Sequence, residues 1–273
     1  MGPDRLRRHR RARAAHRGAR VLRARAAVAR LPRDRPPARR ARLSGRSLGR
    51  APRRPVTRLV LVRHGQTAWN LEGRAQGHTD VGLDETGLAQ AEALAPYVAA
   101  MAPTALWSSD LTRAQQTATV LASATGLDVR SDRRLREFDA GERAGLTTAE
   151  FADTFPEAYA SWREGHITGH VPGAETVADV VARMVPALQE IWESTPAGET
   201  TVVVAHGACL KVSLLAFLGW PDTLLGTLRG LDNCGWSVLE DDAHGRGIRL
   251  ASYNETAHPA VHGPDFASDA PVG

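Results

Sequence analysis

The chain has 273 residues, 42% of them hydrophobic, a formal net charge of +5 and only two cysteines, Cys209 and Cys234. Two cysteines exclude a disulfide framework, no apolar run is long enough for a membrane-spanning helix, and no apolar core of a secretory signal follows Met1. We therefore expect a cytoplasmic protein whose length allows one large hydrophobic core.

The positive charge is concentrated in the first 55 residues. Residues 1–55 contain 20 arginines, no lysine and two acids, a net charge of +18, so the remainder of the chain carries −13. Such a stretch buries too little apolar surface to offset its chain entropy, and we predict a disordered Arg-rich extension. It could be a nucleic-acid-binding arm, an organelle transit peptide, or upstream sequence translated from a misassigned start. We favour the last interpretation and do not expect a nucleic-acid partner, because no aromatic residues are interleaved with the arginines.

Residues 56–257 alternate short apolar runs with segments of helical spacing, and we predict one domain there, followed by an irregular tail over residues 258–273. The apolar runs predict strands at Arg58–Val62, Ala105–Ser108, Thr200–Ala205, Gly235–Leu239 and Ile248–Tyr253. The segments of helical spacing predict helices at Asp84–Met101, from an Asp110 cap through Ala124, twice around Pro156 within Thr147–Glu164, at Glu175–Ser194 and after Gly207. In the first of these helices we expect one buried face made of Leu88, Ala91, Leu94 and Ala95. This alternation predicts the α/β class, as a three-layer α/β/α sandwich with a mostly parallel sheet.

Two of the predicted strands run directly into a histidine followed by a glycine. The first leads into RHG at Arg63, His64 and Gly65, and the strand Thr200–Ala205 leads into AHG at His206. Ligands of parallel sheets bind at the carboxyl ends of the strands, so we expect both histidines in one site. The glycine after His64 suggests a place where the backbone must approach a ligand closely.

The residue types at these positions suit phosphoryl transfer. That reaction needs a nucleophile, positive groups on the phosphoryl oxygens and a proton for the leaving oxygen. A neutral His64 can supply the nucleophile, and nearby arginines lower the pKa of an imidazole and keep it neutral. Arg113 projects from the first turn of a predicted helix, and its guanidinium can bind phosphate in a bidentate manner that lysine cannot reproduce.

The motifs RHGQTAWN (63–70), SSDLTRA (108–114), LRE (135–137) and AHG (205–207), in this order, resemble the histidine phosphatase superfamily, also called phosphoglycerate mutase-like. The resemblance covers about Leu59 to Asn254. It implies that His64 accepts the phosphoryl group, which water later releases, and that Glu137 is the proton donor. It implies further phosphate-binding and substrate-binding residues: Arg63, Arg113, His206 and Asn70 for the phosphate, and Gln76, Gly77 and Gly207 for the rest of the substrate.

Two of these assignments leave alternatives open. Asp139 and Glu142 lie close to Glu137 in the sequence, and either could be the proton donor instead. Gln76 and Gly77 could equally form a plain turn.

The superfamily contains hydrolases and cofactor-dependent phosphoglycerate mutases, and three departures favour hydrolysis here. Thr148 stands where mutases carry a lysine, Glu164 stands where they carry the second arginine of a pair, and the longer mutase insertion is absent between Glu164 and the helix that follows. We therefore expect a phosphomonoester hydrolase without cofactor or metal, acting on a small metabolite of the sugar phosphate or phosphoglycerate type. A cofactor-dependent phosphoglycerate mutase is the alternative. The segment GLDNCGWSVL (230–239) resembles actinobacterial phosphatases of the glucosyl-3-phosphoglycerate phosphatase type.

Overall fold

The computed structural model describes residues 55–166, 170–242 and 245–257. The extension predicted for residues 1–55, apart from Pro55, and the tail predicted for residues 258–273, lie outside the described residues. The helices and strands that follow extend from Arg58 to Glu255, within the range predicted as one domain.

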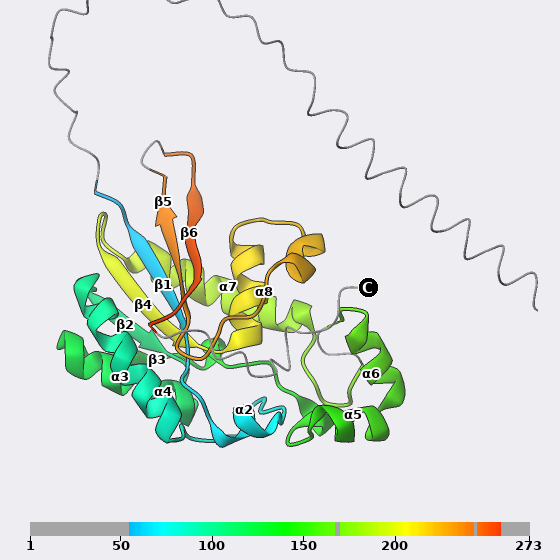
Figure 1. The fold of residues 1–273 in the computed structure, drawn as a ribbon. Coiled ribbons are helices and arrows are strands. Elements are labelled where there is room, and N and C mark those ends of the chain that lie inside the picture. Colours follow the sequence, from blue (N-terminus) through cyan, green and yellow to red (C-terminus); the bar gives the residue numbers. More distant parts are fainter. Residues whose placement is uncertain (1–54, 167–169, 243–244, 258–273) are drawn as a thin grey trace, which may run out of the picture. The chain divides into compact units, whose positions relative to one another are not determined.

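A six-stranded sheet forms the centre of this part, in the order β3-β2-β4-β1-β5-β6 (Figure 1). The first four strands in this order are parallel, β5 is antiparallel to β1, and β6 is antiparallel to β5, so the mostly parallel sheet is confirmed. The bounds of the strands are β1 Arg58–Arg63, β2 Ala105–Ser108, β3 Val129–Ser131, β4 Thr200–Ala205, β5 Trp236–Asp241 and β6 Ile248–Glu255. Strand β3 was not predicted, because its three residues at the edge of the sheet include a single apolar side chain.

Helices cover both faces of the sheet and complete the three layers predicted for this part of the chain. Helices α3 and α4 lie on one face, and α7 and α8 lie on the other (Figure 1). The bounds of the helices are α2 Ala68–Glu72, α3 Glu85–Ala100, α4 Thr112–Thr125, α5 Thr148–Thr154, α6 Pro156–Arg163, α7 Val177–Ser194 and α8 Gly207–Phe217. Short 3₁₀ turns occupy Arg133–Leu135, Gly141–Arg143 and Asp222–Thr227.

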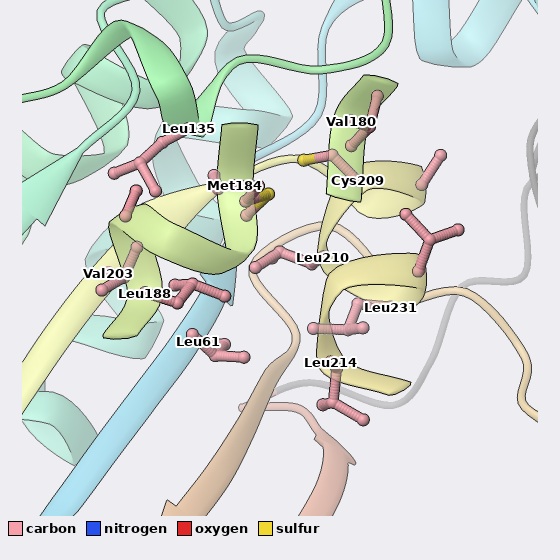
Figure 2. Close-up of a cluster of buried hydrophobic side chains, with 14 of the residues drawn as sticks. Leu61, Leu135, Val180, Met184, Leu188, Val203, Cys209, Leu210, Leu214 and Leu231 are labelled. Atoms are coloured by element: carbon pink, nitrogen blue, oxygen red, sulfur yellow. The ribbon is translucent and has the colours of Figure 1, made fainter. Parts of the chain in front are cut away.

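Successive side chains of the central strands point to opposite faces of the sheet and pack into two separate hydrophobic cores. Val60 and Val62 of β1 pack in the core beneath α3 and α4, whereas Leu61 packs in the core beneath α7 and α8. Figure 2 shows this second core, in which Leu61 and Val203 of the sheet face Leu188 of α7 and Leu210 of α8. Burial on both faces explains why β1 and β4 read as continuous apolar runs rather than as alternating ones.

Two local predictions for the helices were wrong. Asp110 does not cap α4, because its carboxylate forms a bidentate pair with Arg136, with both N–O distances 2.7 Å. The helix begins at Thr112 instead, and the distant Asp80 accepts the hydrogen bond of the Thr112 N–H at 2.7 Å. On α3, Leu88 is 40% exposed and Gly87 is buried in its place on the inner face.

Candidate active site

The two histidines predicted to share a site lie side by side. Strands β1 and β4 are parallel neighbours in which Arg63 is paired with Ala205, so His64 and His206 follow at the same edge of the sheet. Their ring centroids are 5.2 Å apart with an interplanar angle of 60°, and both side chains are buried. The register of two parallel strands therefore brings together residues that are far apart in the sequence.

The hydrogen bond of His64 defines which of its ring nitrogens is free. Nδ1 lies 2.7 Å from the carbonyl oxygen of Gly65. A carbonyl oxygen only accepts hydrogen bonds, so Nδ1 carries the proton and Nε2 keeps its lone pair. Burial, and then the charges of Arg113 and Arg63, lower the pKa of His64 well below its usual value. The imidazole is therefore neutral at pH 7 and nucleophilic at Nε2.

The second histidine is also neutral and is held from both sides. Arg113 donates from Nε to Nδ1 of His206 at 3.2 Å, and Nε2 of His206 lies 2.9 Å from the hydroxyl oxygen of Ser109. Because Nδ1 accepts, Nε2 carries the proton and donates it. Burial, followed by the charge of Arg113, lowers the pKa of His206 well below its usual value. Ser109, which the sequence analysis did not single out, thus helps to orient the ring.

Two arginines flank the histidines, and backbone carbonyls fix both of them. Arg113 is almost fully buried and donates from Nη1 to the Thr79 carbonyl at 2.9 Å and from Nη2 to the Gly77 carbonyl at 2.8 Å. Burial lowers the pKa of Arg113 to about 10, so the guanidinium is still charged at neutral pH. Arg63 donates from Nη1 to the Leu231 carbonyl at 2.5 Å. Charged, rigid guanidinium groups of this kind suit the binding of a phosphate.

Glycines beside these groups allow close packing. A Cβ on Gly207 would lie 3.2 Å from Nε of Arg63, so this glycine makes room for the arginine side chain. A Cβ on Gly65 would lie 2.4 Å from the carbonyl oxygen of Gly87, in the first turn of α3. The absence of a side chain at Gly65 therefore allows α3 to pack closely, and the close approach of a ligand at Gly65 stays a prediction.

Glu137 lies at the N-terminus of α8. Its carboxylate accepts three backbone hydrogen bonds, from Phe138 at 2.9 Å, Ala208 at 3.1 Å and Cys209 at 2.9 Å. The free N–H groups and the dipole at a helix N-terminus favour a negative group at this position. These bonds hold the carboxylate over the first turn of α8, at the wall of the same pocket as His64.

A second set of contacts holds the backbone of Glu137, and the sequence analysis did not foresee it. Arg183 of α7 donates from Nη2 to the Glu137 carbonyl at 2.8 Å, and Nε2 of His78 donates to the same oxygen at 2.8 Å. Arg183 is in turn paired with Glu175, with an N–O distance of 2.7 Å. One signal in the sequence could have revealed Arg183, because it lies one helical turn from the buried Val180 and Ala187, on a face where a solvated arginine is not expected.

The remaining predicted residues line the same pocket as His64 but differ in the hydrogen-bonding groups that they present to a ligand. Asn70 uses Oδ1 to accept hydrogen bonds from the backbone and hydroxyl of Thr67, both at 3.1 Å, which leaves its Nδ2 group as the donor for a ligand. Gly77 has a φ of 52°, and a Cβ there would lie 2.7 Å from the backbone of Ala140. Gln76 is buried, and its Oε1 has no hydrogen-bond partner among the described residues.

One pocket is lined by eight of the nine predicted site residues: Arg63, His64, Asn70, Gln76, Gly77, Arg113, Glu137 and Gly207. The ninth, His206, lies behind them in contact with Arg113. Asp139 also lines the pocket and stays an alternative to Glu137, whereas Glu142 does not line it. Two arginines that were not predicted, Arg74 and Arg143, complete the charged lining.

Other reactive groups of the described residues do not add to this site. Burial raises the pKa of the Cys209 thiol well above its usual value, so it is a protonated packing residue. No group of three or more potential metal ligands lies together within residues 55–166, 170–242 and 245–257. Over the same ranges, no helix is both long and apolar enough to cross a bilayer.

Comparisons with known proteins point to one family. The family model described as histidine phosphatase superfamily (branch 1) matches residues 59–256. Glucosyl-3-phosphoglycerate phosphatase of Mycobacterium tuberculosis (strain ATCC 25618 / H37Rv) is 39% identical over 189 residues, which cover 67% of this chain and 84% of that protein. Probable phosphoglycerate mutase GpmB of Yersinia enterocolitica is 36% identical over 210 residues, which cover 74% of this chain and 95% of that protein.

A solved structure extends the similarity to three dimensions. The mycobacterial glucosyl-3-phosphoglycerate phosphatase in complex with VO3 superposes with a TM-score of 0.67 and is 38% identical. The match covers 73% of this chain and 99% of that chain. The α/β fold with its mostly parallel sheet is therefore shared along the whole length of that relative.

Proposed function

We propose that this protein, which belongs to the histidine phosphatase superfamily and is a phosphoric monoester hydrolase, transfers the phosphoryl group of a small metabolite first to Nε2 of His64 and then to water. The observation that carries this proposal is the hydrogen bond from Nδ1 of His64 to the Gly65 carbonyl. It leaves the lone pair of Nε2 free in a pocket that Arg63 and Arg113 also line.

In the first step, Nε2 of His64 attacks phosphorus and the bond from phosphorus to the ester oxygen breaks. The electron pair of that bond leaves with the oxygen, which takes a proton from the carboxyl group of Glu137 and departs as an alcohol. Glu137 carries that proton when the ester is bound, because the phosphate dianion beside it opposes a second negative charge. Arg63 and Arg113 stabilise the negative charge on the phosphoryl oxygens. The hydrogen bond to His206 helps to hold the Arg113 guanidinium in place.

In the second step, water attacks the phosphorus of the phosphohistidine. The carboxylate of Glu137 takes a proton from that water, the bond between phosphorus and Nε2 breaks, and its electron pair returns to the ring. Inorganic phosphate is released, and both His64 and Glu137 regain their starting states.

We favour hydrolysis over mutase activity, because neither of the positions where mutases carry further cations supplies one to this pocket. A mutase must retain a doubly phosphorylated intermediate, which needs cationic contacts for its second phosphate. Thr148, at the position where the family resemblance places a mutase lysine, is an uncharged residue at the start of α5 and is not among the pocket-lining residues. Arg163 and Glu164 are exposed and do not line the pocket either. By analogy with the named relatives, the substrate is a sugar phosphate or a phosphoglycerate derivative.

The test is to incubate the full chain with 3-phosphoglycerate and to measure both free phosphate and 2-phosphoglycerate. An alkaline quench followed by mass spectrometry of peptides locates the phosphoryl group. We expect free phosphate as the main phosphorus product, a phosphohistidine on the His64 peptide, and loss of turnover in His64→Ala. Full activity in His64→Ala, or a phosphoryl group on another residue, would overturn the mechanism, and an excess of 2-phosphoglycerate would establish the mutase.

A further inference from the structure

The segment that carries His78 joins two parts of the candidate active site. The carbonyl oxygens of Gly77 and Thr79 accept hydrogen bonds from the Arg113 guanidinium at 2.8 and 2.9 Å. The backbone on both sides of His78 is therefore tied to an arginine of the pocket. The His78 side chain reaches a different part of the site, where its Nε2 lies 2.8 Å from the carbonyl oxygen of Glu137. One tripeptide thus connects Arg113 with Glu137.

Close packing of two backbones brings this segment to Glu137. Gly77 has a φ of 52°, and a Cβ at this position would lie 2.7 Å from the backbone nitrogen of Ala140. A larger residue would push the segment away from the chain that follows Glu137. The His78 side chain is 28% exposed, so most of its surface is covered. The position of the imidazole is therefore set by the fold around it.

The two ring nitrogens of His78 make unequal contacts. A carbonyl oxygen only accepts hydrogen bonds, so Nε2 carries a proton and donates it to the Glu137 carbonyl. Nδ1 lies 3.5 Å from Oδ2 of Asp139, beyond the range of about 2.7–3.2 Å that is usual for an N–H···O hydrogen bond. The distance from Nε2 to Oε2 of Glu175 is longer still, at 3.9 Å. The hydrogen bond to the carbonyl is therefore the contact that fixes the ring.

The carbonyl of Glu137 and the N–H of Phe138 belong to the same peptide group. Its oxygen receives His78 from the loop after α2 and Arg183 from α7, both at 2.8 Å. Its N–H donates to Oε1 of the Glu137 side chain at 2.9 Å. Because a peptide group is planar and rigid, a tilt at the oxygen also moves the N–H that holds the carboxylate. A donor at the oxygen therefore acts on the carboxylate through the peptide group.

We infer that His78 is a positioning residue for proton transfer to the leaving oxygen, because its Nε2–H fixes the peptide group that orients the Glu137 carboxyl. The inference rests on the proposed phosphatase function, in which Glu137 is the proton donor. Loss of the His78 donor should slow the step that needs this proton. It should leave phosphate binding intact, since the backbone carbonyls that hold Arg113 do not depend on the His78 side chain.

Two amide side chains of different length test which ring nitrogen matters. The amide nitrogen of glutamine can take the place of Nε2, whereas that of asparagine takes the place of Nδ1. We expect His78→Asn to lower kcat/KM by about tenfold for glycerol 3-phosphate and by less than about twofold for p-nitrophenyl phosphate, whose leaving group needs no proton. His78→Gln should restore most of the activity on glycerol 3-phosphate. The inhibition constant of inorganic phosphate should stay within about twofold of the wild type in both variants. Thermal melts check that both are folded.

Three results would contradict the inference. An equal fall of kcat/KM for both esters in His78→Asn would assign His78 a structural role alone. Equal losses in His78→Gln and His78→Asn would show that the hydrogen bond from Nε2 is not the cause. A loss in His78→Gln but not in His78→Asn would transfer the role to the contact between Nδ1 and Asp139.

The wild-type chain separates this inference from the proposed function. If it hydrolysed both esters through a phosphohistidine on His64 while the His78 variants gave one of these three results, the inference would fail and the proposed function would stand. If it hydrolysed neither ester and formed no phosphohistidine, the proposed function itself would fail.

Discussion

The Nε–H of Arg113 donates to Nδ1 of His206 at 3.2 Å, so one buried guanidinium sets the tautomer of the second histidine. The same segment supplies Ser109, whose hydroxyl receives the other ring N–H at 2.9 Å. Ser109 and Arg113 therefore fix the His206 ring by hydrogen bonds at both of its nitrogens. These two hydrogen bonds join the segment Ser109–Arg113 to the AHG motif in one site, although β3, α5, α6 and α7 lie between them in the chain.

Replacement of Arg113 by lysine should lower the activity severely although the positive charge is kept. A single ammonium group cannot reproduce the planar set of contacts to Gly77, Thr79 and His206. We expect Arg113→Lys to lower kcat/KM by about 100-fold or more, which corresponds to about 3 kcal/mol of lost transition-state stabilisation. Circular dichroism and a thermal melt check that the variant is folded. A kcat/KM within about threefold of the wild type would show that the geometry of Arg113 is unimportant.

Replacement of Glu137 should depend on the leaving group. Glu137→Gln cannot protonate the departing oxygen, which matters for an alkyl ester and matters little for p-nitrophenyl phosphate, whose leaving group is stable without a proton. We expect kcat/KM to fall about 100- to 1,000-fold for glycerol 3-phosphate and less than about tenfold for p-nitrophenyl phosphate. Asp139→Asn is the matched comparison, because Asp139 also lines the pocket. If Asp139→Asn showed this dependence and Glu137→Gln did not, Asp139 would be the acid.

Arg183 should act through Glu137 as a positioning residue. Arg183→Met keeps an unbranched apolar stem but removes the guanidinium, and with it the hydrogen bonds to the carbonyls of Arg134, Arg136 and Glu137 and the pairing with Glu175. We expect a loss of about 1–3 kcal/mol in the free energy of unfolding and a selective loss of activity on alkyl esters. In a Glu137→Gln background, the same change should not alter the leaving-group dependence further. An equal loss on alkyl and aryl esters in the wild-type background would indicate a structural role alone.

The two buried histidines should make the fold sensitive to mild acid. Burial, and then the charge of Arg113, lower the pKa of both His64 and His206 in the folded protein. In the unfolded chain they titrate near pH 6.5, so below this pH the unfolded state binds more protons and the free energy of unfolding falls. The slope approaches about 1.4 kcal/mol per pH unit for each histidine.

Urea unfolding at pH 7, 6 and 5 measures this effect. We expect His206→Gln to reduce the slope by about 1 kcal/mol per pH unit between pH 6 and 5. His166→Gln replaces an exposed histidine and serves as the control for the loss of an imidazole outside the buried pair. Equal slopes in the wild type and in His206→Gln would show that His206 does not titrate differently on folding.

Local patterns in the sequence were enough to predict the fold class and eight of the residues that line the pocket. Continuous apolar runs such as β4 identify strands buried on both faces, and this burial depends only on the local pattern of side chains. Histidines placed directly after such strands lie at one edge of a parallel sheet, because the carboxyl ends of parallel strands lie together. The direct contact of His64 with His206 depends in addition on the strand order, in which β1 and β4 are neighbours.

The partner of each polar group could not be predicted from the sequence and follows from the folded structure. Asp110 reads as a helix cap, yet it pairs with Arg136, and Asp80 caps the helix instead. Arg183 and Arg143 read as ordinary charged residues until the fold brings one to the backbone of Glu137 and the other to the pocket wall. Hydrogen bonds and ion pairs join residues that are distant along the chain, and no local periodicity encodes them, whereas burial in a strand or helix leaves a repeating pattern in the sequence itself.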